Sequence, residues 1–186
     1  MLPSLVPLVF EARDWTHGVL VGASMGSETT AAATGAVGVM RRDPMAMKPF
    51  CGYNFADYFA HWLSFDKPGA QLPKVFHVNW FRKGQDGGFL WPGFGENLRV
   101  LEWMIERVEN RIPAIETPIG RLPESSGLNL GGLALSGEAL AQLFAFESKD
   151  WEDEFLDIQE YLATYGRGIP DQLVGEVHET VAKLAQ

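Results

Sequence analysis

The chain has 186 residues, 46% apolar and 21% charged, a composition typical of a globular domain with a sizeable core and not of a disordered segment. No apolar run approaches the roughly 20 residues that span a bilayer, which excludes a transmembrane helix. The net charge of −9 comes from residues 124–186, because residues 1–123 carry twelve acidic and twelve basic side chains. This acidic excess repels a phosphate backbone, so nucleic acid is disfavoured as a partner.

The opening MLPSLVPLVF has neither a basic leader nor a small-residue cleavage site, so we do not interpret it as a signal peptide. The single cysteine, Cys51, excludes a disulfide within the chain. No base adjoins Cys51 in the sequence, so an inert buried thiol is the simpler interpretation. Together these features favour a cytoplasmic protein without membrane contact.

The first forty residues predict two short buried strands and a segment of small side chains. Apolar runs at 6–10 and 19–21 are typical of buried strands, with a turn at His17-Gly18 between them. Residues 22–38 are mostly small and cannot anchor themselves in a core, so we expect a mobile segment. A strand at 37–40 follows.

An ordered loop is predicted for residues 41–54, because prolines and a glycine interrupt them. Residues 53–65 then predict a largely buried helix with Phe55, Phe59 and Trp62 at helical spacing. His61 lies on this aromatic helix, and we expect it to be a packed, hydrogen-bonded core histidine.

Residues 74–81 are rich in β-forming side chains and predict a buried strand. The sequence GQDGG at 84–88 predicts a hairpin turn that returns the chain into Phe89. A helix with an apolar stripe follows. The stripe comprises Leu98, Leu101, Met104, Ile105 and Val108, and the charged face comprises Arg99, Glu102, Glu106 and Glu109.

The acidic tail carries three further helical patterns, at 136–146, 148–164 and 170–185. Its charge run is best explained as a solvated helix face. The second pattern places four large apolar side chains in register, namely Trp151, Phe155, Ile158 and Leu162.

The common motifs of catalysis and phosphate binding do not occur in the sequence. There is no G-x-x-x-x-G-K followed by Ser or Thr, and no G-x-G-x-x-G. None of the four histidines has the spacing of a metal ligand. The residues therefore do not build a complete active site.

The stretch NWFRKGQDGGFLWPGFGEN, at 79–97, combines five large aromatic residues with five glycines. Two aromatic rings on separate segments can hold a flat heterocycle between them, and adjacent glycines let the backbone approach it. Asn97 offers both a donor and an acceptor to the edge of a base. From the residues alone, aromatics that cap a local core remain the simpler explanation, and a base-binding slot is the alternative.

Four blocks of sequence, in order, carry a resemblance to a known family. They are VPLVFEARDWTHGVLVGASMGSETTAAA, DPMAMKPFCGYNFADYFAHWLSF, LPKVFHVNWFRK and FLWPGFGENLRVLEWM. From about Val6 to Leu130 they resemble the C-terminal portion of GTP-dependent phosphoenolpyruvate carboxykinase, and the acidic tail is compatible with it. The resemblance implies an α/β fold with a mixed sheet and packed helices, in which 1–123 form part of a nucleotide-binding domain and 124–186 an acidic helical segment.

That family converts oxaloacetate and GTP to phosphoenolpyruvate, CO₂ and GDP in gluconeogenesis, with Mn²⁺ or Mg²⁺. The resemblance implies that Phe81 and Phe94 stack on guanine, that Phe89 forms a third wall and that Asn97 reads the base edge. Phe50 matches an aromatic residue beside the oxaloacetate and phosphoenolpyruvate site. The implied guanine pocket comprises Trp80, Phe81, Phe89, Phe94, Gly95, Glu96 and Asn97. The implied active-site lid comprises Ser27, Glu28, Thr29, Thr30, Ala31, Ala32, Ala33, Thr34, Gly35, Ala36, Val37 and Gly38.

The sequence departs from the family pattern in two respects. Many relatives carry an arginine in place of Gly26 and charged residues in place of 34–36, which changes the contacts expected of a closed lid. The family's phosphate loop, reactive cysteine, metal ligands and substrate arginines belong upstream of the matched blocks, and Cys51 is not that reactive cysteine. We therefore expect no catalytic residues, no metal ligands and no catalysis from the isolated chain. The alternative is a non-catalytic interaction module, with self-association through open strand edges.

Overall fold

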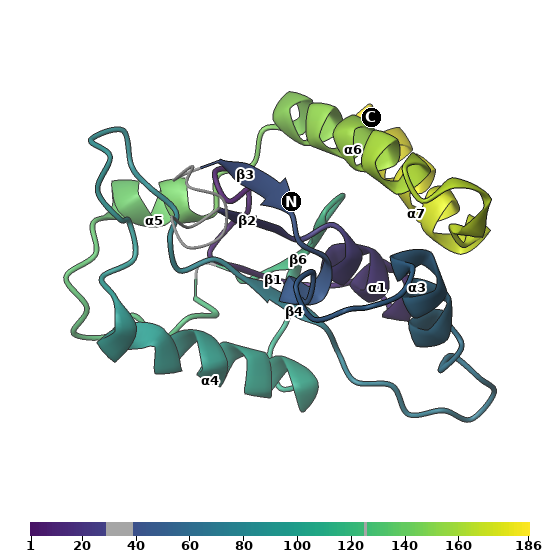
Figure 1. Cartoon of the computed structure of the whole chain (residues 1–186). Helices are drawn as coiled ribbons and strands as arrows, with labels where there is room; N and C mark the ends of the chain where they lie inside the picture. The colour runs from purple at the N-terminus through teal and green to yellow at the C-terminus, as the bar shows by residue number, and fades with distance from the viewer. Residues whose placement is uncertain (29–38, 125) are drawn as a thin grey trace.

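The computed structural model of the chain describes residues 1–28, 39–124 and 126–186. Within them, four strands form an antiparallel sheet in the order β4-β1-β6-β5 (Figure 1). The strands are β1 (Val9–Glu11), β4 (Phe76–Val78), β5 (Ile115–Thr117) and β6 (Gly120–Leu122). With helices packed around this sheet, the predicted α/β fold is confirmed. The predicted strands at 6–10 and 74–81 are present but shortened to three residues each.

Alternate side chains of the central strands enter two separate apolar clusters, as the pleat of a strand requires. The register pairs Val9 with Val78 and Phe10 with His77. Val9 packs in one cluster with helix α4 (Asn97–Val108), whereas Phe10 packs in the other, with the remaining long helices. Strand β1 is thus covered on both faces.

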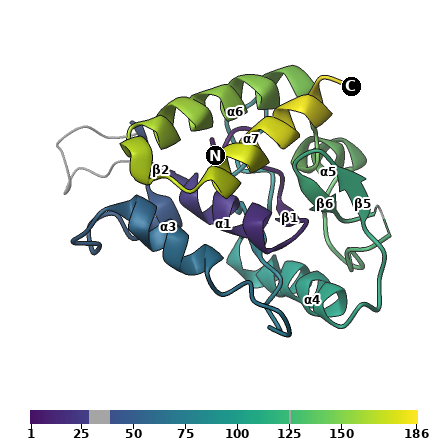
Figure 2. The same cartoon turned by 90° about the vertical axis from the view of Figure 1, so that its right-hand side faces the viewer.

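The second cluster is formed by helices α1 (Trp15–Ala23), α3 (Phe55–Leu63), α6 (Ser148–Ala163) and α7 (Asp171–Leu184). Helices α6 and α7 lie side by side, and α7 also contacts α1 (Figures 1 and 2). With α5 (Gly137–Leu143), these confirm the three helices predicted for the tail. The side chains predicted to be in register on α6 are all buried, namely Trp151, Phe155, Ile158 and Leu162.

The strand predicted at 19–21 is wrong, because these residues belong to helix α1. The Asp14 carboxylate begins the helix by accepting the backbone N–H of His17 at 2.9 Å. Gly18 is not a turn residue but lies within the helix, where a Cβ would come within 2.9 Å of the Val75 Cβ. A helix buried on nearly every side shows a continuous apolar run, and such a run does not distinguish it from a buried strand.

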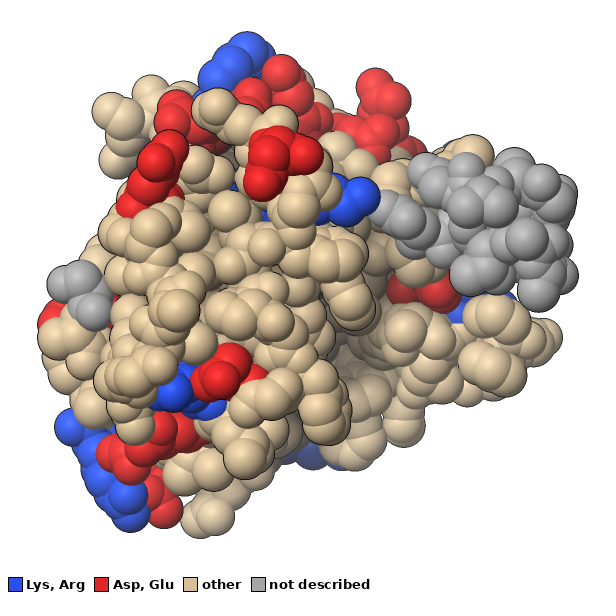
Figure 3. All heavy atoms as spheres, turned by 90° about the vertical axis from the view of Figure 1, so that its left-hand side faces the viewer, with Lys and Arg blue, Asp and Glu red and all other residues tan. Residues whose placement is uncertain are grey.

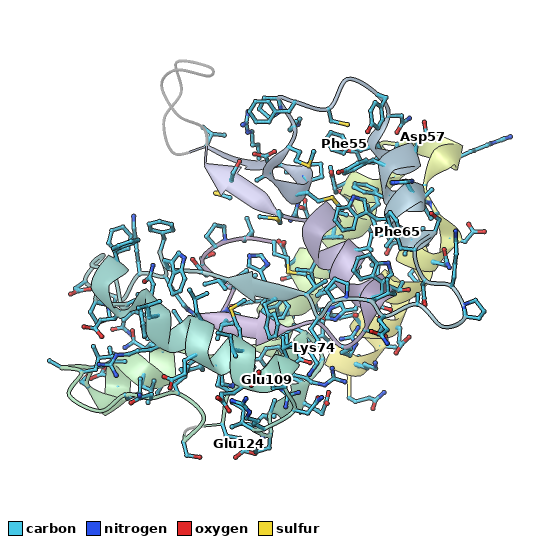
Figure 4. The ribbon with its side chains drawn as sticks, turned by 90° about the horizontal axis from the view of Figure 1, so that it is seen from below. Phe55, Asp57, Phe65, Lys74, Glu109 and Glu124 are labelled. Atoms are coloured by element: carbon cyan, nitrogen blue, oxygen red, sulfur yellow. The ribbon has the colours of Figure 1, made fainter. Side chains whose placement is uncertain are left out.

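Helix α3 is confirmed, with Phe55 and Phe59 buried, but the expectation for His61 is wrong. His61 is exposed near the end of the helix and packs edge-to-face on Phe65, which follows the helix (Figure 4). A histidine with no exposed surface is found instead at His17 on α1. Position on an aromatic helix therefore did not predict burial.

Helix α4 is also present, but its burial differs from the sequence pattern. The fully buried side chains are Val100 and Trp103. Four of the five residues of the predicted stripe are exposed, namely Leu98, Leu101, Ile105 and Val108. The helix thus packs on the sheet with a face other than the stripe.

Strands β2 (Gly26–Glu28) and β3 (Met40–Arg42) form a separate antiparallel pair. The predicted strand at 37–40 overlaps β3 at Met40, and a short 3₁₀ helix, η1 (Pro44–Ala46), follows within the predicted loop. The predicted mobile segment falls mostly on residues 29–38, which lie outside the described residues. No helix in the described part of the chain is long and apolar enough to cross a bilayer.

Candidate functional site

The predicted turn at 84–88 is confirmed as a hairpin. The Gly84 N–H donates to the Gly88 carbonyl at 2.9 Å, and the Gly87 N–H donates to the Gly84 carbonyl at 3.0 Å. Gly87 has a φ of 79°, a left-handed conformation that favours glycine. The hairpin brings the rings of Phe81 and Phe89 together edge-to-face, with centroids 5.8 Å apart.

Three aromatic rings of the predicted guanine pocket are exposed. The exposed fractions are 66% for Phe81, 60% for Phe89 and 92% for Phe94. Phe94 begins the 3₁₀ helix η2 (Phe94–Glu96), directly after Gly93 with a φ of 121°. The explanation that these aromatics cap a local core therefore does not fit these three rings, and it fits the fully buried Trp91 and the half-buried Trp80 that packs against it.

Asn97, the first residue of α4, is held by that buried tryptophan. The Trp91 indole N–H donates to Asn97 Oδ1 at 2.9 Å. An indole N–H is only a donor, so the amide oxygen must be the atom that faces it. This contact fixes the orientation of the Asn97 amide and leaves its –NH₂ group as the available donor.

A cavity of about 480 Å³ adjoins the hairpin. It is lined by Phe81, Phe89 and Lys83, by Ser27 of β2, and by His77 and Asn79 of the central sheet region. It therefore joins two predicted elements, the aromatic pocket and the first residue of the lid. Phe94, Asn97 and Phe50 are not among its lining residues.

Among the lining residues that were not predicted from the sequence are three polar ones, His77, Asn79 and Lys83. Asn79 holds the pocket strand in place: its Nδ2 donates to the Pro3 and Val6 carbonyls at 2.6 and 2.9 Å, and its Oδ1 accepts the Phe81 N–H at 3.1 Å. A polar residue that interrupts a run of β-forming side chains is a signal that could have identified it.

His77 faces the cavity as a neutral imidazole. Burial lowers the pKa of His77 to about 3, and its Nδ1 has no hydrogen-bond partner among the described residues. Lys83 supplies positive charge beside the pocket, with its Nζ 5.8 Å from the centroid of the Phe89 ring. The face shown in Figure 3 has acidic side chains gathered along its upper edge and a mixed group of acidic and basic side chains at its lower left.

The remaining predicted site residues do not line the cavity. Trp80 is half-buried and tilts against Trp91 at 6.3 Å between centroids. The Glu96 carboxylate is 2.6 Å from Arg99 Nε, and Gly95 is exposed. Phe50 is 82% exposed in the turn after η1.

The predicted lid is described only at its first two residues, Ser27 and Glu28, which belong to β2. Ser27 Oγ donates to Asp43 Oδ2 at 2.9 Å, next to the end of β3. The other predicted lid residues, 29–38, lie outside the described residues. The β2–β3 pair thus holds the two ends of that segment close to each other.

The comparisons with known proteins agree on one family. A family model described as the phosphoenolpyruvate carboxykinase C-terminal P-loop domain matches residues 2–183. The chain is 51% identical to the GTP-dependent phosphoenolpyruvate carboxykinase of Thermoplasma volcanium over 173 residues, which are 93% of this chain and 29% of that protein. It is 51% identical to the Renibacterium salmoninarum enzyme over 174 residues, which cover 92% and 29% of the two chains.

The same enzyme from Chlamydia trachomatis is 49% identical over 180 residues, or 96% of this chain and 30% of the relative. The chain therefore spans less than a third of the length of these relatives. The chain belongs to the GTP-dependent phosphoenolpyruvate carboxykinase family and corresponds to the C-terminal portion of its members.

Proposed function

We propose that the chain supplies the guanine pocket and the active-site lid of a GTP-dependent phosphoenolpyruvate carboxykinase. The whole enzyme would convert oxaloacetate and GTP to phosphoenolpyruvate, CO₂ and GDP, as part of gluconeogenesis. The observation that carries the proposal is that the rings of Phe81 and Phe94 are both exposed, and that Trp91 holds Asn97, three residues after Phe94, in one orientation. Exposed apolar side chains that gather in one patch mark ligand or partner sites more often than single exposed ones do, and the rings of Phe81 and Phe89 are in contact.

The chemistry of the pocket favours guanine over adenine. Guanine carries an acceptor, O6, where adenine carries an amino donor. Because Trp91 occupies Asn97 Oδ1, the Asn97 –NH₂ donates toward the base, which suits O6 and opposes the adenine amine. Phe81 and Phe94 contribute stacking that does not discriminate between bases.

The lid at 27–38 would close over the reacting groups and open for product release. Closure excludes water from the enolate of pyruvate that forms when oxaloacetate loses CO₂. The β2–β3 pair supports this assignment, because it anchors one end of the segment at the cavity beside Phe81. Phe50 would lie beside the oxaloacetate and phosphoenolpyruvate site.

The described part of this chain offers no set of side chains that could bind the metal ion of the reaction. Those residues contain no group of three His, Cys, Asp or Glu side chains that could hold one. We therefore assign no metal-dependent step to these residues. The isolated chain is expected to form no phosphoenolpyruvate from oxaloacetate, GTP and Mn²⁺, because phosphoryl transfer requires phosphate and metal ligands in place. Measurable product formation would contradict this assignment.

The experiment that tests the proposal is a titration of the chain with GDP and with ADP. Stacking contributes about 1–3 kcal/mol per base, so we expect GDP to bind the isolated chain only at millimolar concentration. Phe94→Ala should weaken GDP binding by roughly 5- to 100-fold. Phe65→Ala removes another exposed ring, after α3, and serves as the matched control. Equal affinity of the parent and Phe94→Ala for GDP would contradict the stacking assignment.

A further inference from the structure

Helix α4 has apolar residues on two faces, and the sheet covers only one of them. Val100 and Trp103 are buried against the sheet. The residues that we name the outer stripe are exposed by 73% at Leu98, 40% at Leu101, 56% at Ile105 and 53% at Val108. A helix that faces water normally carries polar residues on its outer side, so an apolar outer stripe indicates a surface that is covered in the functional protein.

The spacing of the outer stripe indicates the shape of what covers it. Its members follow one another at intervals of three, four and three residues. This is the a/d spacing of a helix that packs lengthwise against another helix. Helix α4 lies along the outside of the molecule, with Glu109 and Lys74 at its C-terminal end, so its outer side is open to a partner over its whole length (Figure 4).

The charges beside the outer stripe argue against a second copy of this chain as the partner. Glu102 and Glu109 occupy the position that follows each d residue, and both are exposed. An antiparallel pair of α4 helices would bring Glu102 close to Glu109 of the other copy, which repel each other. A parallel pair would place Asn97 and Met104 against these glutamates, so neither arrangement supplies a basic partner.

The comparisons supply the occupant. The chain matches the C-terminal portion of relatives of which it spans 29–30%, so the larger part of those proteins lies N-terminal to the matched region. We infer that the outer stripe is the docking surface for this N-terminal part, through an amphipathic helix with basic residues along its edge. This inference goes beyond the proposed function and does not require that the guanine pocket be correct.

The test is hydroxyl-radical footprinting of two samples. The first is the 186-residue chain alone, and the second is a full-length chimaera in which this chain replaces the matched region of the Renibacterium salmoninarum enzyme. Leu101 and Ile105 should oxidise readily in the chain alone and about tenfold more slowly in the chimaera, as expected for side chains that enter an interface core. Leu156, which is 45% exposed on α6, is the matched control and should react alike in both samples.

A second measurement uses substitution. In the chimaera, Leu101→Asp should lower the melting temperature, whereas Leu156→Asp should leave it unchanged. In the chain alone, neither substitution should change the melting temperature. If the chimaera does not fold, the protection is measured instead on the aligned helix of the intact Renibacterium salmoninarum enzyme. Equal oxidation of the stripe in the short and long proteins would overturn the inference. A stable dimer of the chain alone that protects Leu101 would also overturn it, in favour of a second copy.

Discussion

Trp91 is a buried residue that orients a side chain of the proposed guanine pocket. It is 2% exposed and is not expected to touch the base, yet its indole N–H holds Asn97 Oδ1 at 2.9 Å. Trp91→Phe keeps most of the ring and removes this donor. The Asn97 amide can then rotate and offer its oxygen to adenine.

We expect Trp91→Phe to reduce the preference for GDP over ADP about tenfold, equivalent to roughly 1.4 kcal/mol or one hydrogen bond. Competition between the two nucleotides measures this ratio. Trp62→Phe, on α3, controls for the loss of an indole elsewhere. An unchanged ratio in a folded Trp91→Phe variant would rule out the orienting role of Trp91.

His77 should make stability depend on pH. The unfolded chain protonates this imidazole near pH 6.5, whereas burial lowers the pKa of His77 in the folded chain to about 3. Between these values the unfolded state binds more protons, so the contribution is complete above pH 6.5 and is lost as the pH falls. This loss is about 2 kcal/mol between pH 7 and pH 5 for one such histidine.

The measurement is urea denaturation at pH 7 and pH 5. The loss of unfolding free energy on acidification should be smaller in His77→Gln than in the parent. His61→Gln removes an exposed histidine and serves as the control. An identical pH dependence in His77→Gln and the parent would show that His77 is not buried as a neutral group.

At the scale of elements, Arg42 of β3 links the β2–β3 pair to helix α6 through ion pairs. Its Nη1 lies 2.7 Å from Glu154 Oε1, and its guanidinium also pairs with Asp157. The Glu154 side chain is fully buried, and its Oε1 also accepts the Leu2 N–H at 3.1 Å and lies 3.5 Å from the N-terminal nitrogen of Met1, so Arg42 is one of three groups that stabilise its charge. The contact therefore links the ends of the predicted lid to the C-terminal helices.

Arg42→Ala should destabilise the chain by about 3 kcal/mol, because it leaves the Glu154 carboxylate buried without its guanidinium. Arg41→Ala is the matched control, since Arg41 is more exposed and is 3.7 Å from Asp43. Chemical denaturation of both variants gives the comparison. A loss in Arg42→Ala no greater than in Arg41→Ala would show that the pair contributes little.

Elements with a distinct signal were predictable from the sequence, and those whose signal depends on distant contacts were not. The hairpin at 84–88 was predictable because its glycines act locally. Helix α1 was mistaken for a strand because the close approach of Val75 that places Gly18 inside a helix involves a residue 57 positions away in the sequence. The apolar stripe of α4 predicted a helix correctly, but periodicity does not tell which of two apolar faces meets the sheet.

The residues of the pocket also divide into those with a local sequence signal and those whose role depends on distant contacts. The aromatic members, Phe81 and Phe94, stood out because aromatics beside glycines form a local pattern, which the resemblance to the family then assigned to the pocket. Asn79 and His77 escaped notice because their roles arise from contacts with β1 and the residues before it.

At the scale of the whole molecule, the acidic segment 124–186 is part of the core and not an appendage. Leu128 and Leu143 complete the cluster beneath α4, and Trp151 and Phe155 complete the cluster beneath α6. Most of the acidic side chains of these helices face solvent, as their pattern predicted, but Glu154 of α6 and Glu176 of α7 are buried. Segment 124–186 covers the sheet side of α4 and leaves its outer stripe exposed.

The most direct test of the central claim is nuclear magnetic resonance of the chain with labelled phenylalanine rings, titrated with GDP to saturation. A purine between Phe81 and Phe94 should shift the resonances of both rings upfield and give Overhauser contacts to the guanine H8 proton. ADP should produce smaller shifts at the same concentration. If GDP leaves these two rings unchanged, or shifts rings elsewhere in the molecule, guanine is not recognised at this site.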